Sequence, residues 1–201
     1  MKNTILNKCM NVIKTNNPNL SNKELDKMRY GLEGLYLNLT KIIVIFIISL
    51  IIGIFKETIL LLLIFNGIRI TSFGVHAKRS IDCLISSLIL FLGFPLLCVH
   101  LIIPLFIKYI LFLPLVILIG IFAPCDTEKR PLKDKKKRTI YKILSILISI
   151  IYMTLSILIK DNTLSNCFIF ALVIQIIVML PITYKLFGVS YNNYKKYEAN
   201  N

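Results

Sequence analysis

The stretch from residue 66 to residue 87 holds the two residues best suited to nucleophilic chemistry, His76 and Cys83. They share one polar interruption between apolar runs, with the sequence NGIRITSFGVHAKRSIDCLISS. A cysteine is nucleophilic only as the thiolate, and a nearby imidazole that accepts the thiol proton supplies this form near neutral pH. The pair therefore indicates a cysteine-type acyl transfer site. A metal site is not predicted, because two ligands alone do not fill a tetrahedral shell.

The spacing of the two residues limits the backbone that joins them. Seven residues of continuous helix would leave the side chains about 10 Å apart along the axis, so catalysis needs non-helical backbone between them. Gly74 offers flexibility before the histidine, and Ser80 is suited to cap a helix that has Cys83 in its first turn. There the helix dipole and free amides would favour the thiolate and bind an oxyanion. Three nearby cations act in the same direction: Arg69, Lys78 and Arg79.

A structural role for both residues is the alternative. In membrane proteins a histidine is often an interfacial polar residue, and a cysteine is often a small buried one. The second histidine, His100, is expected at the opposite membrane boundary. The other cysteines are widely spaced without a CxxC pair, so they predict apolar fillers and no disulfide framework. They are Cys9, Cys98, Cys125 and Cys167.

The composition is that of a chain that crosses a lipid bilayer several times. Of the 201 residues, 56% are hydrophobic, and the mean hydropathy is +0.76. The formal charge of +14 comes from Lys and Arg residues that flank apolar runs. Such residues set membrane topology and contact anionic headgroups. Membrane lipids are therefore expected partners, and nucleic acid is not.

The apolar pattern predicts an all-α, polytopic integral membrane protein. Residues 1–40 are expected to form amphipathic N-terminal helices in the membrane interface. About six transmembrane helices follow within residues 41–184, and a basic cytoplasmic loop at 125–139 interrupts them. The third is expected from near Leu84 to around His100, and Pro104 and Lys108 are expected between it and the fourth, which ends before Ala123-Pro124. The fifth is expected from Ile140 to Ile159 and the sixth from about Leu164 to Tyr184. Residues 185–201 form a polar cytoplasmic tail that is expected to be disordered past Tyr191. The N-terminus lacks the apolar core of a signal peptide, so insertion is expected to rely on the internal spans.

Charge counting predicts which loops face the cytoplasm. Seven of the ten residues from 129 to 138 are Lys or Arg, and short loops rich in these residues stay inside. Six spans counted from this loop put both termini and residues 69–83 on the cytoplasmic side. Three of the 24 positive residues then lie outside: Lys56, Lys108 and Lys160.

At these residues the chain resembles the accessory gene regulator B family, membrane cysteine endopeptidases that process the precursor of a cyclic quorum-sensing peptide. The family usually has an Arg, a pair of Gly, then His-Ala and a Cys at this spacing. Phe73 here replaces the first Gly of the pair. The matching run comprises Arg69, Gly74, His76-Ala77 and Cys83. Two further stretches resemble the family: an entry helix at Tyr30-Gly31-Leu32-Glu33, and a basic loop from Ala123-Pro124 through Lys129-Arg130-Pro131.

The resemblance implies a bacterial cell-membrane peptidase in which residues 1–201 are a single domain. His76 would deprotonate Cys83, and the thiolate would cleave off the C-terminal part of a small AgrD-like precursor peptide. The remaining peptide would be held as a thioester, whose energy lets an internal thiol or hydroxyl close a thiolactone or lactone ring. This scheme needs no metal or organic cofactor.

Charged residues near the predicted site could support this chemistry. An acidic tail of the precursor could meet basic patches, although the basic loop is equally explained as a topology signal. These patches comprise Lys78, Arg79, Lys129 and Arg130. Asp82 adjoins Cys83, where its charge would oppose the thiolate, so it is interpreted as a first-turn helix residue. The sequence does not choose among three carboxylates that could orient His76: Glu33, Asp82 and Asp126.

Two other functions fit the same topology. A non-catalytic membrane protein that binds or exports a small peptide or lipid should survive the change Cys83→Ser, whereas a peptidase should not. A structural membrane protein whose basic loop recruits a soluble partner should depend on the loop more than on Cys83. The sequence leaves open whether the chain forms a homodimer, which ring is closed, and whether the product is also exported.

Overall fold

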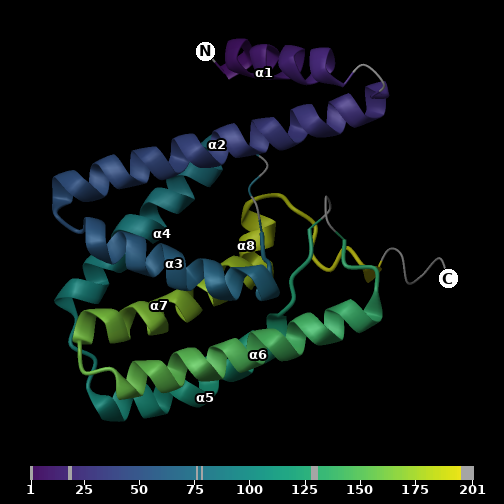
Figure 1. Ribbon diagram of the computed structural model, residues 1–201. Coiled ribbons are helices and arrows are strands. Elements are labelled where there is room, and N and C mark those ends of the chain that lie inside the picture. The colour runs from purple at the N-terminus through teal and green to yellow at the C-terminus, as the bar shows by residue number, and fades with distance from the viewer. Residues whose placement is uncertain (1, 18–19, 76, 78, 128–130, 196–201) are drawn as a thin grey trace. The chain divides into compact units, whose positions relative to one another are not determined.

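The structure of the protein is a computed structural model in which most described residues are α-helical. It describes residues 2–17, 20–75, 77, 79–127 and 131–195. Within these ranges there are helices and no named strands, which confirms the predicted all-α class. The helices are α1 (Lys2–Asn16), α2 (Asn22–Ile52), α3 (Phe55–Ser72), α4 (Ser80–His100), α5 (Leu105–Phe122), α6 (Lys135–Leu158), α7 (Asn162–Met179) and α8 (Pro181–Leu186) (Figure 1).

The chain divides into two compact units, residues 1–48 and residues 49–201. The first unit contains α1 and most of α2. Leu6 and Met10 lie one turn apart on α1 and are buried, as the amphipathic pattern predicts. A capping box starts α2, because the Ser21 hydroxyl and amide both donate to the Glu24 carboxylate, at 2.7 and 2.9 Å.

Five of the described helices are long and apolar enough to cross a bilayer: α2, α4, α5, α6 and α7. The chain is therefore a polytopic membrane protein. The remaining predicted span is α3, which has 18 residues and is mostly apolar. It differs from the others because it carries Lys56 and Glu57 in its first turn and Arg69 in its last.

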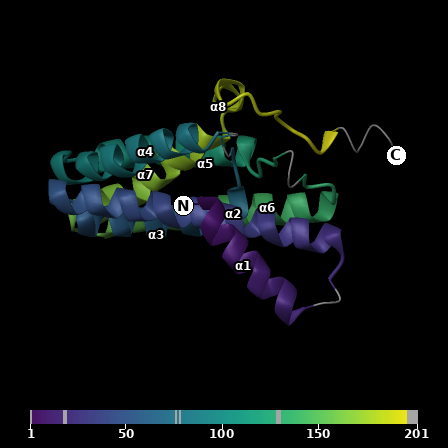
Figure 2. The same cartoon turned by 90° about the horizontal axis from the view of Figure 1, so that it is seen from above.

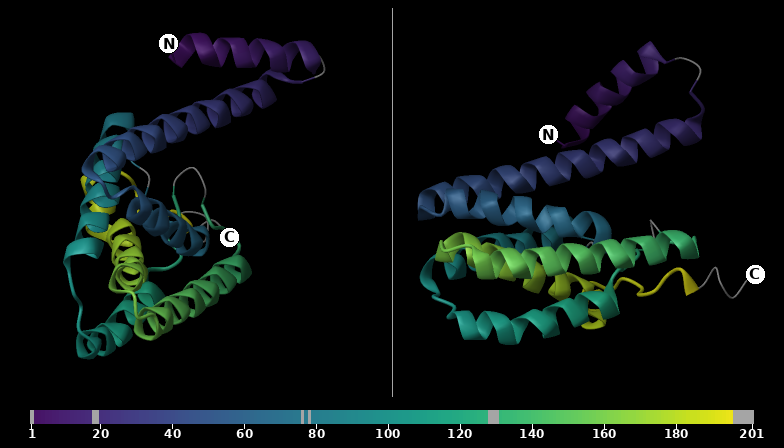
Figure 3. Two further views of the ribbon diagram at one scale, coloured as in Figure 1. Left: turned by 60° about the vertical axis from the view of Figure 1, so that its left-hand side comes forward. Right: turned by 60° about the horizontal axis from the view of Figure 1, so that its bottom comes forward.

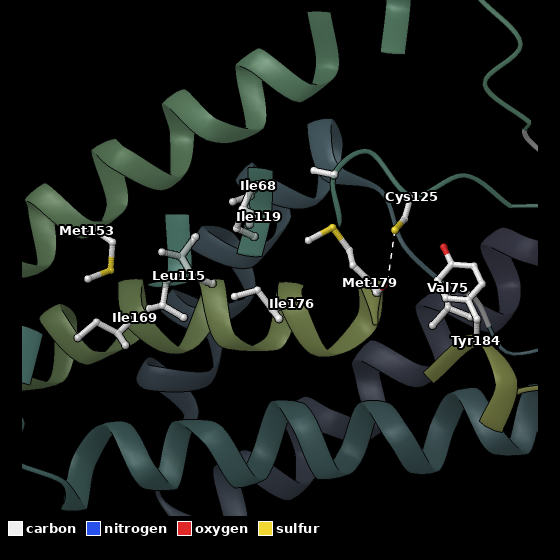
Figure 4. Packing of buried hydrophobic residues seen from close by; sticks show 12 residues of the cluster. Ile68, Val75, Leu115, Ile119, Cys125, Met153, Ile169, Ile176, Met179 and Tyr184 are labelled. Carbon is white, nitrogen blue, oxygen red and sulfur yellow. Dashed lines mark hydrogen bonds between the residues drawn. The ribbon is translucent and has the colours of Figure 1, made fainter. Parts of the chain in front are cut away.

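Helix α7 lies at the centre of the second unit. It packs against α4 on one side and against α5 and α6 on the other, while α3 lies along it and also contacts α4 and α6 (Figures 1 and 2). Helices α5 and α6 run antiparallel and side by side (Figure 3). Apolar residues on all sides of α7 suit this surrounded position. The core includes Ile68, Leu115, Ile119, Met153, Ile169, Leu172, Ile176 and Met179 (Figure 4).

Two polar contacts fix how the helices of this unit pack. The Tyr152 hydroxyl donates to the Ile64 carbonyl at 2.8 Å and lies where a Cβ atom on Gly67 would be. A side chain at position 67 would therefore displace the Tyr152 hydroxyl from this position. Lys108 was predicted between spans, but it lies inside α5 and is only 5% exposed. Its ammonium donates to the carbonyl of Ser156, near the end of α6, and to the hydroxyl of Ser165 on α7.

The last predicted span, from about Leu164 to Tyr184, is broken near its end. Helix α7 stops at Met179, and Leu180 has extended backbone with φ −60° and ψ 138°. Pro181 explains the break, because proline disfavours helical backbone at the preceding residue and then starts the next helix well. The short helix α8 that follows brings Tyr184 into the core, where it is fully buried.

Candidate active site

The predicted catalytic segment joins the end of α3 to the start of α4. The described residues between Ser72 and Ser80 are not helical. The spacing of His76 and Cys83 requires such non-helical backbone if the two side chains are to meet. Cys83 is half-buried in the first turn of α4. His76 and Lys78 lie outside the described residues.

The residue that caps α4 is Arg79, and the prediction of Ser80 at this position is wrong. Arg79 has extended backbone, with φ −92° and ψ 136°, and no side chain caps the helix. Its carbonyl accepts the Cys83 N–H at 3.2 Å, so the amide of Cys83 is not free to bind an oxyanion. The amides without an intrahelical acceptor belong to the three helical residues before Cys83. Asp82 is an acidic first-turn residue, as interpreted.

Arg69 holds the three residues that precede His76. Its Nη1 donates to the Phe73 carbonyl at 2.5 Å, and its Nη2 donates to the carbonyls of Gly74 and Val75 at 3.1 and 2.9 Å. A guanidinium can do this because its donors form a rigid planar fork. From the last turn of α3, the side chain thus fixes the path of the chain that leaves the helix.

The backbone of the same segment is paired with the loop that follows α5. The Gly74 N–H donates to the Cys125 carbonyl at 3.1 Å, and the Cys125 N–H donates to the Ser72 carbonyl at 2.9 Å. Phe73 and Cys125 thereby form an isolated parallel bridge. This loop is the one that the resemblance identified, and it contributes to the site through its backbone.

Helix α7 supplies two further hydrogen bonds to the segment. The Val75 N–H donates to the Val178 carbonyl at 3.0 Å, and the Gln175 Nε2 donates to the Phe73 carbonyl at 2.7 Å. Gln175 is fully buried. Sequence reasoning missed it, although an amide within an apolar span is a signal of functional or structural importance.

The backbone at Phe73 and Gly74 is in conformations that favour glycine. Phe73 has φ 57° and ψ −141°, and Gly74 has φ 128°. A Cβ atom on Gly74 would meet the Arg69 guanidinium and would lie 2.9 Å from the Val178 carbonyl oxygen. Gly74 therefore provides a specific turn and close approach, and the flexibility expected from the sequence is not its role. Phe73 is the residue that replaces a family glycine, and its ring packs edge-on against Tyr141, with centroids 5.0 Å apart.

Arg69 also brings positive charge to the site. Among the described residues, ionisable groups that interact electrostatically with its guanidinium include Tyr184, Cys125 and Cys83. Burial raises the pKa of Cys125 to about 11, and burial also raises the pKa of Tyr184, so both are neutral near pH 7. Cys83 is the more exposed thiol of the two.

The other predicted supporting residues belong to different elements of the chain. Glu33 belongs to α2 in the first unit, Pro131 precedes α6, and Arg79 is exposed beside Cys83. Lys129 and Arg130 lie outside the described residues.

Asp126 is a structural anchor in the described part of the chain. Its carboxylate accepts backbone N–H groups from Leu132, Asn193 and Tyr194. Those contacts hold the tail in place as far as Tyr194, so the prediction of disorder past Tyr191 is wrong for these residues.

The remaining cysteines mostly behave as predicted. Cys98, Cys125 and Cys167 are buried, and Cys9 is exposed on α1. His100 is exposed at the last residue of α4, at the opposite end of that helix from Cys83.

Arg69→Lys is expected to destabilise the second unit. A lysine ammonium is a single point donor and cannot bind three carbonyls at once, so buried carbonyls would lose their partners. The free energy of unfolding should fall by at least about 2 kcal/mol. Thermal unfolding in detergent measures this, with Arg29→Lys on the exposed surface of α2 as the control. Equal melting temperatures for the two variants would contradict the role assigned to the Arg69 fork.

Comparison with known proteins gives a match over most of the chain. Residues 6–179 match the family described as Accessory gene regulator B. An AgrB-like protein of Clostridium acetobutylicum is 34% identical over 175 residues, which cover 87% of this chain and 84% of the relative. An AgrB-like protein of Listeria monocytogenes is 30% identical, with 86% and 84% covered. The accessory gene regulator protein B of Staphylococcus intermedius is 31% identical, with 82% and 86% covered. No solved structure matches the chain.

Proposed function

Because the chain belongs to the accessory gene regulator B family, which has a role in processing a quorum-sensing peptide, we propose that it is a membrane cysteine endopeptidase. It cleaves the C-terminal part from an AgrD-like signal-peptide precursor. The observation that carries this proposal is the site around Cys83. A half-buried thiol lies in the first turn of α4 and interacts electrostatically with Arg69, and Arg69 fixes the segment that leads to His76.

The first chemical step forms a thioester. His76 takes the proton of Cys83, and the thiolate attacks the carbonyl carbon of the scissile peptide bond. The first-turn amides of α4 that have no intrahelical acceptor are donors for the resulting oxyanion. As the C–N bond breaks, the imidazolium of His76 returns the proton to the leaving amine. The C-terminal fragment departs, and the remaining peptide is bound to Cys83.

The second step transfers the acyl group within the substrate. An internal thiol or hydroxyl of the bound peptide attacks the thioester carbonyl and gives its proton to His76, and Cys83 leaves as the thiolate. The product is a thiolactone or lactone ring. Hydrolysis would waste the thioester, so water should be restrained near Cys83.

Counting α3 together with the five helices that are long and apolar enough to cross a bilayer gives six spans, and this number sets the membrane orientation. The basic loop before α6 then faces the cytoplasm, and so do both termini and Cys83. The precursor approaches from this side, with its amphipathic leader in the interface and its acidic tail near the basic residues. The enzyme works without a metal or organic cofactor.

A covalent adduct on Cys83 is the expected result that tests this function. The purified chain in lipid vesicles is mixed with its AgrD-like precursor peptide, and the protein is digested for mass spectrometry. The peptide that contains Cys83 should gain the mass of the N-terminal part of the precursor, and hydroxylamine should remove it because thioesters are cleaved by this nucleophile. Cys9→Ala should form the same adduct. Cleavage of the precursor without an adduct on any cysteine would contradict the thioester route.

A further inference from the structure

The C-terminal segment Ser190–Tyr194 is folded onto the loop that follows α5. The Asp126 carboxylate is only 3% exposed and accepts the N–H groups of Asn193 and Tyr194, each at 2.8 Å. It also accepts the N–H of Leu132 at 3.3 Å. A buried carboxylate is stable when such donors surround it, and within the described part of the chain two of the three backbone donors to the Asp126 carboxylate come from the tail.

Aromatic contacts hold the same segment from both sides. The Tyr191 ring packs edge-on against Tyr184, with centroids 5.1 Å apart, and its hydroxyl contacts the Cys125 Sγ at 3.9 Å. The Arg138 guanidinium lies over the Tyr194 ring, 3.9 Å from its centroid. The segment is therefore attached to α8, to the loop after α5 and to α6.

The loop that the tail holds is also the loop that holds the catalytic segment. Cys125 directly precedes Asp126, and its N–H and carbonyl are paired with Ser72 and Gly74. Its thiol is close to the Met179 carbonyl, as the dashed line in Figure 4 shows, and the buried Tyr184 hydroxyl donates to the Asp126 carbonyl at 3.1 Å. The tail is thus bonded to Asp126, and Cys125, the residue before it, is bonded to Gly74.

We propose that Asp126 and the segment Ser190–Tyr194 form a clamp that positions the backbone carrying His76. Asp126 is a positioning residue, because it acts through Cys125 and does not touch the reacting atoms. Without the two tail donors, its buried carboxylate turns toward water and takes Cys125 away from Gly74. This inference rests on the proposed peptidase function. It adds to the site a part of the chain that does not touch the reacting atoms.

Two truncations and one substitution, each compared with the intact chain in lipid vesicles, test the clamp. A stop after Asn192 removes both tail donors, and a stop after Lys195 keeps them and is the matched control. Asp126→Asn removes the charge that the donors stabilise. The stop after Asn192 and Asp126→Asn should each lower kcat for precursor cleavage at least about 10-fold, with KM within about twofold, because geometry rather than substrate binding is disturbed. The control should cleave like the intact chain.

A double variant shows whether the two changes act through one clamp or as two independent structural losses. If both act through one clamp, Asp126→Asn together with the stop after Asn192 should be no slower than the slower single variant. If the fold-decreases in cleavage rate of the two single variants multiplied in the double variant, the proposal would be overturned. It would also be overturned if the stop after Asn192 cleaved as fast as the stop after Lys195.

Hydrogen exchange supplies a readout that does not depend on cleavage. The amides of Gly74 and Val75 are bonded to protein carbonyls and should exchange at least about 10-fold faster in Asp126→Asn and in the stop after Asn192. The stop after Lys195 should leave their exchange unchanged. If the intact chain fails to cleave the precursor but these exchange rates rise, the clamp is supported and the peptidase proposal fails. Unchanged exchange in all variants would overturn the clamp.

Discussion

Replacing Cys83 by alanine is expected to abolish processing of the precursor. The proposed thioester forms on this sulfur, and removing a nucleophile typically costs a factor of about 10³ or more in rate. Cys83→Ser should lose nearly as much, because a hydroxyl is far harder to deprotonate than a thiol. Release of the C-terminal fragment, measured by mass spectrometry in lipid vesicles, reports the effect.

The fold should tolerate these changes, which keeps the result interpretable. Cys83 is half-buried at the start of α4, so alanine there leaves no large cavity in the core. Membrane insertion and the melting temperature should match those of the intact chain, and Cys9→Ala should process at the normal rate. Normal processing by Cys83→Ala would instead favour a protein that binds or exports a peptide without catalysis.

Hydropathy and charge predicted the architecture well because a bilayer imposes simple rules on a helix. The spans that became α4, α5 and α6 end within a few residues of the expected positions, since their limits are set by apolar length and by Pro or charged residues. The last span was predicted too long, because the effect of Pro181 on Leu180 was not applied. The orientation of the spans and the pairing of His76 with Cys83 stay predictions.

The segment that we propose to be catalytic was chosen from the sequence, but the reasons for its shape could not be found there. Arg69 and Gly74 were identified by resemblance, and their roles were read as charge and flexibility. The structure assigns them a joint geometric role, because three carbonyls converge on one guanidinium and leave no room for a Cβ atom on Gly74. Such contacts link residues through backbone atoms, which are the same in every residue type and leave no pattern in a single sequence.

The distant contributors to the site were missed for the same reason. Gln175 and the carbonyl of Val178 lie about 100 positions from the segment that they hold. Asp126 was considered only as an orienter of His76, because a carboxylate near a histidine suggests that role. Its three backbone donors include two from a tail whose polar composition predicted disorder. The tail is ordered by one buried carboxylate and by aromatic contacts, and neither is visible as a local periodicity.

Gly74→Ala is expected to be the most damaging single change outside the two reacting residues. At φ 128° an alanine is strained by about 1–3 kcal/mol, and its Cβ would also meet the Arg69 guanidinium and the Val178 carbonyl. The segment must then shift, and His76 lies two residues further along the chain. Because a misplacement of about 1 Å can cost a factor of about 100 in rate, kcat/KM for precursor cleavage should fall by about that factor.

Gly93→Ala is the matched control for this prediction, because it makes the same chemical change within α4. A Cβ atom at Gly93 has no heavy atom within 4 Å, and Gly93 does not have the positive φ that Gly74 has. Alanine there should raise helix stability by up to about 1 kcal/mol and leave cleavage within about twofold. The two variants should therefore separate in both melting temperature and kcat/KM. If Gly74→Ala behaved like Gly93→Ala, the turn at Gly74 would not be what positions the catalytic segment.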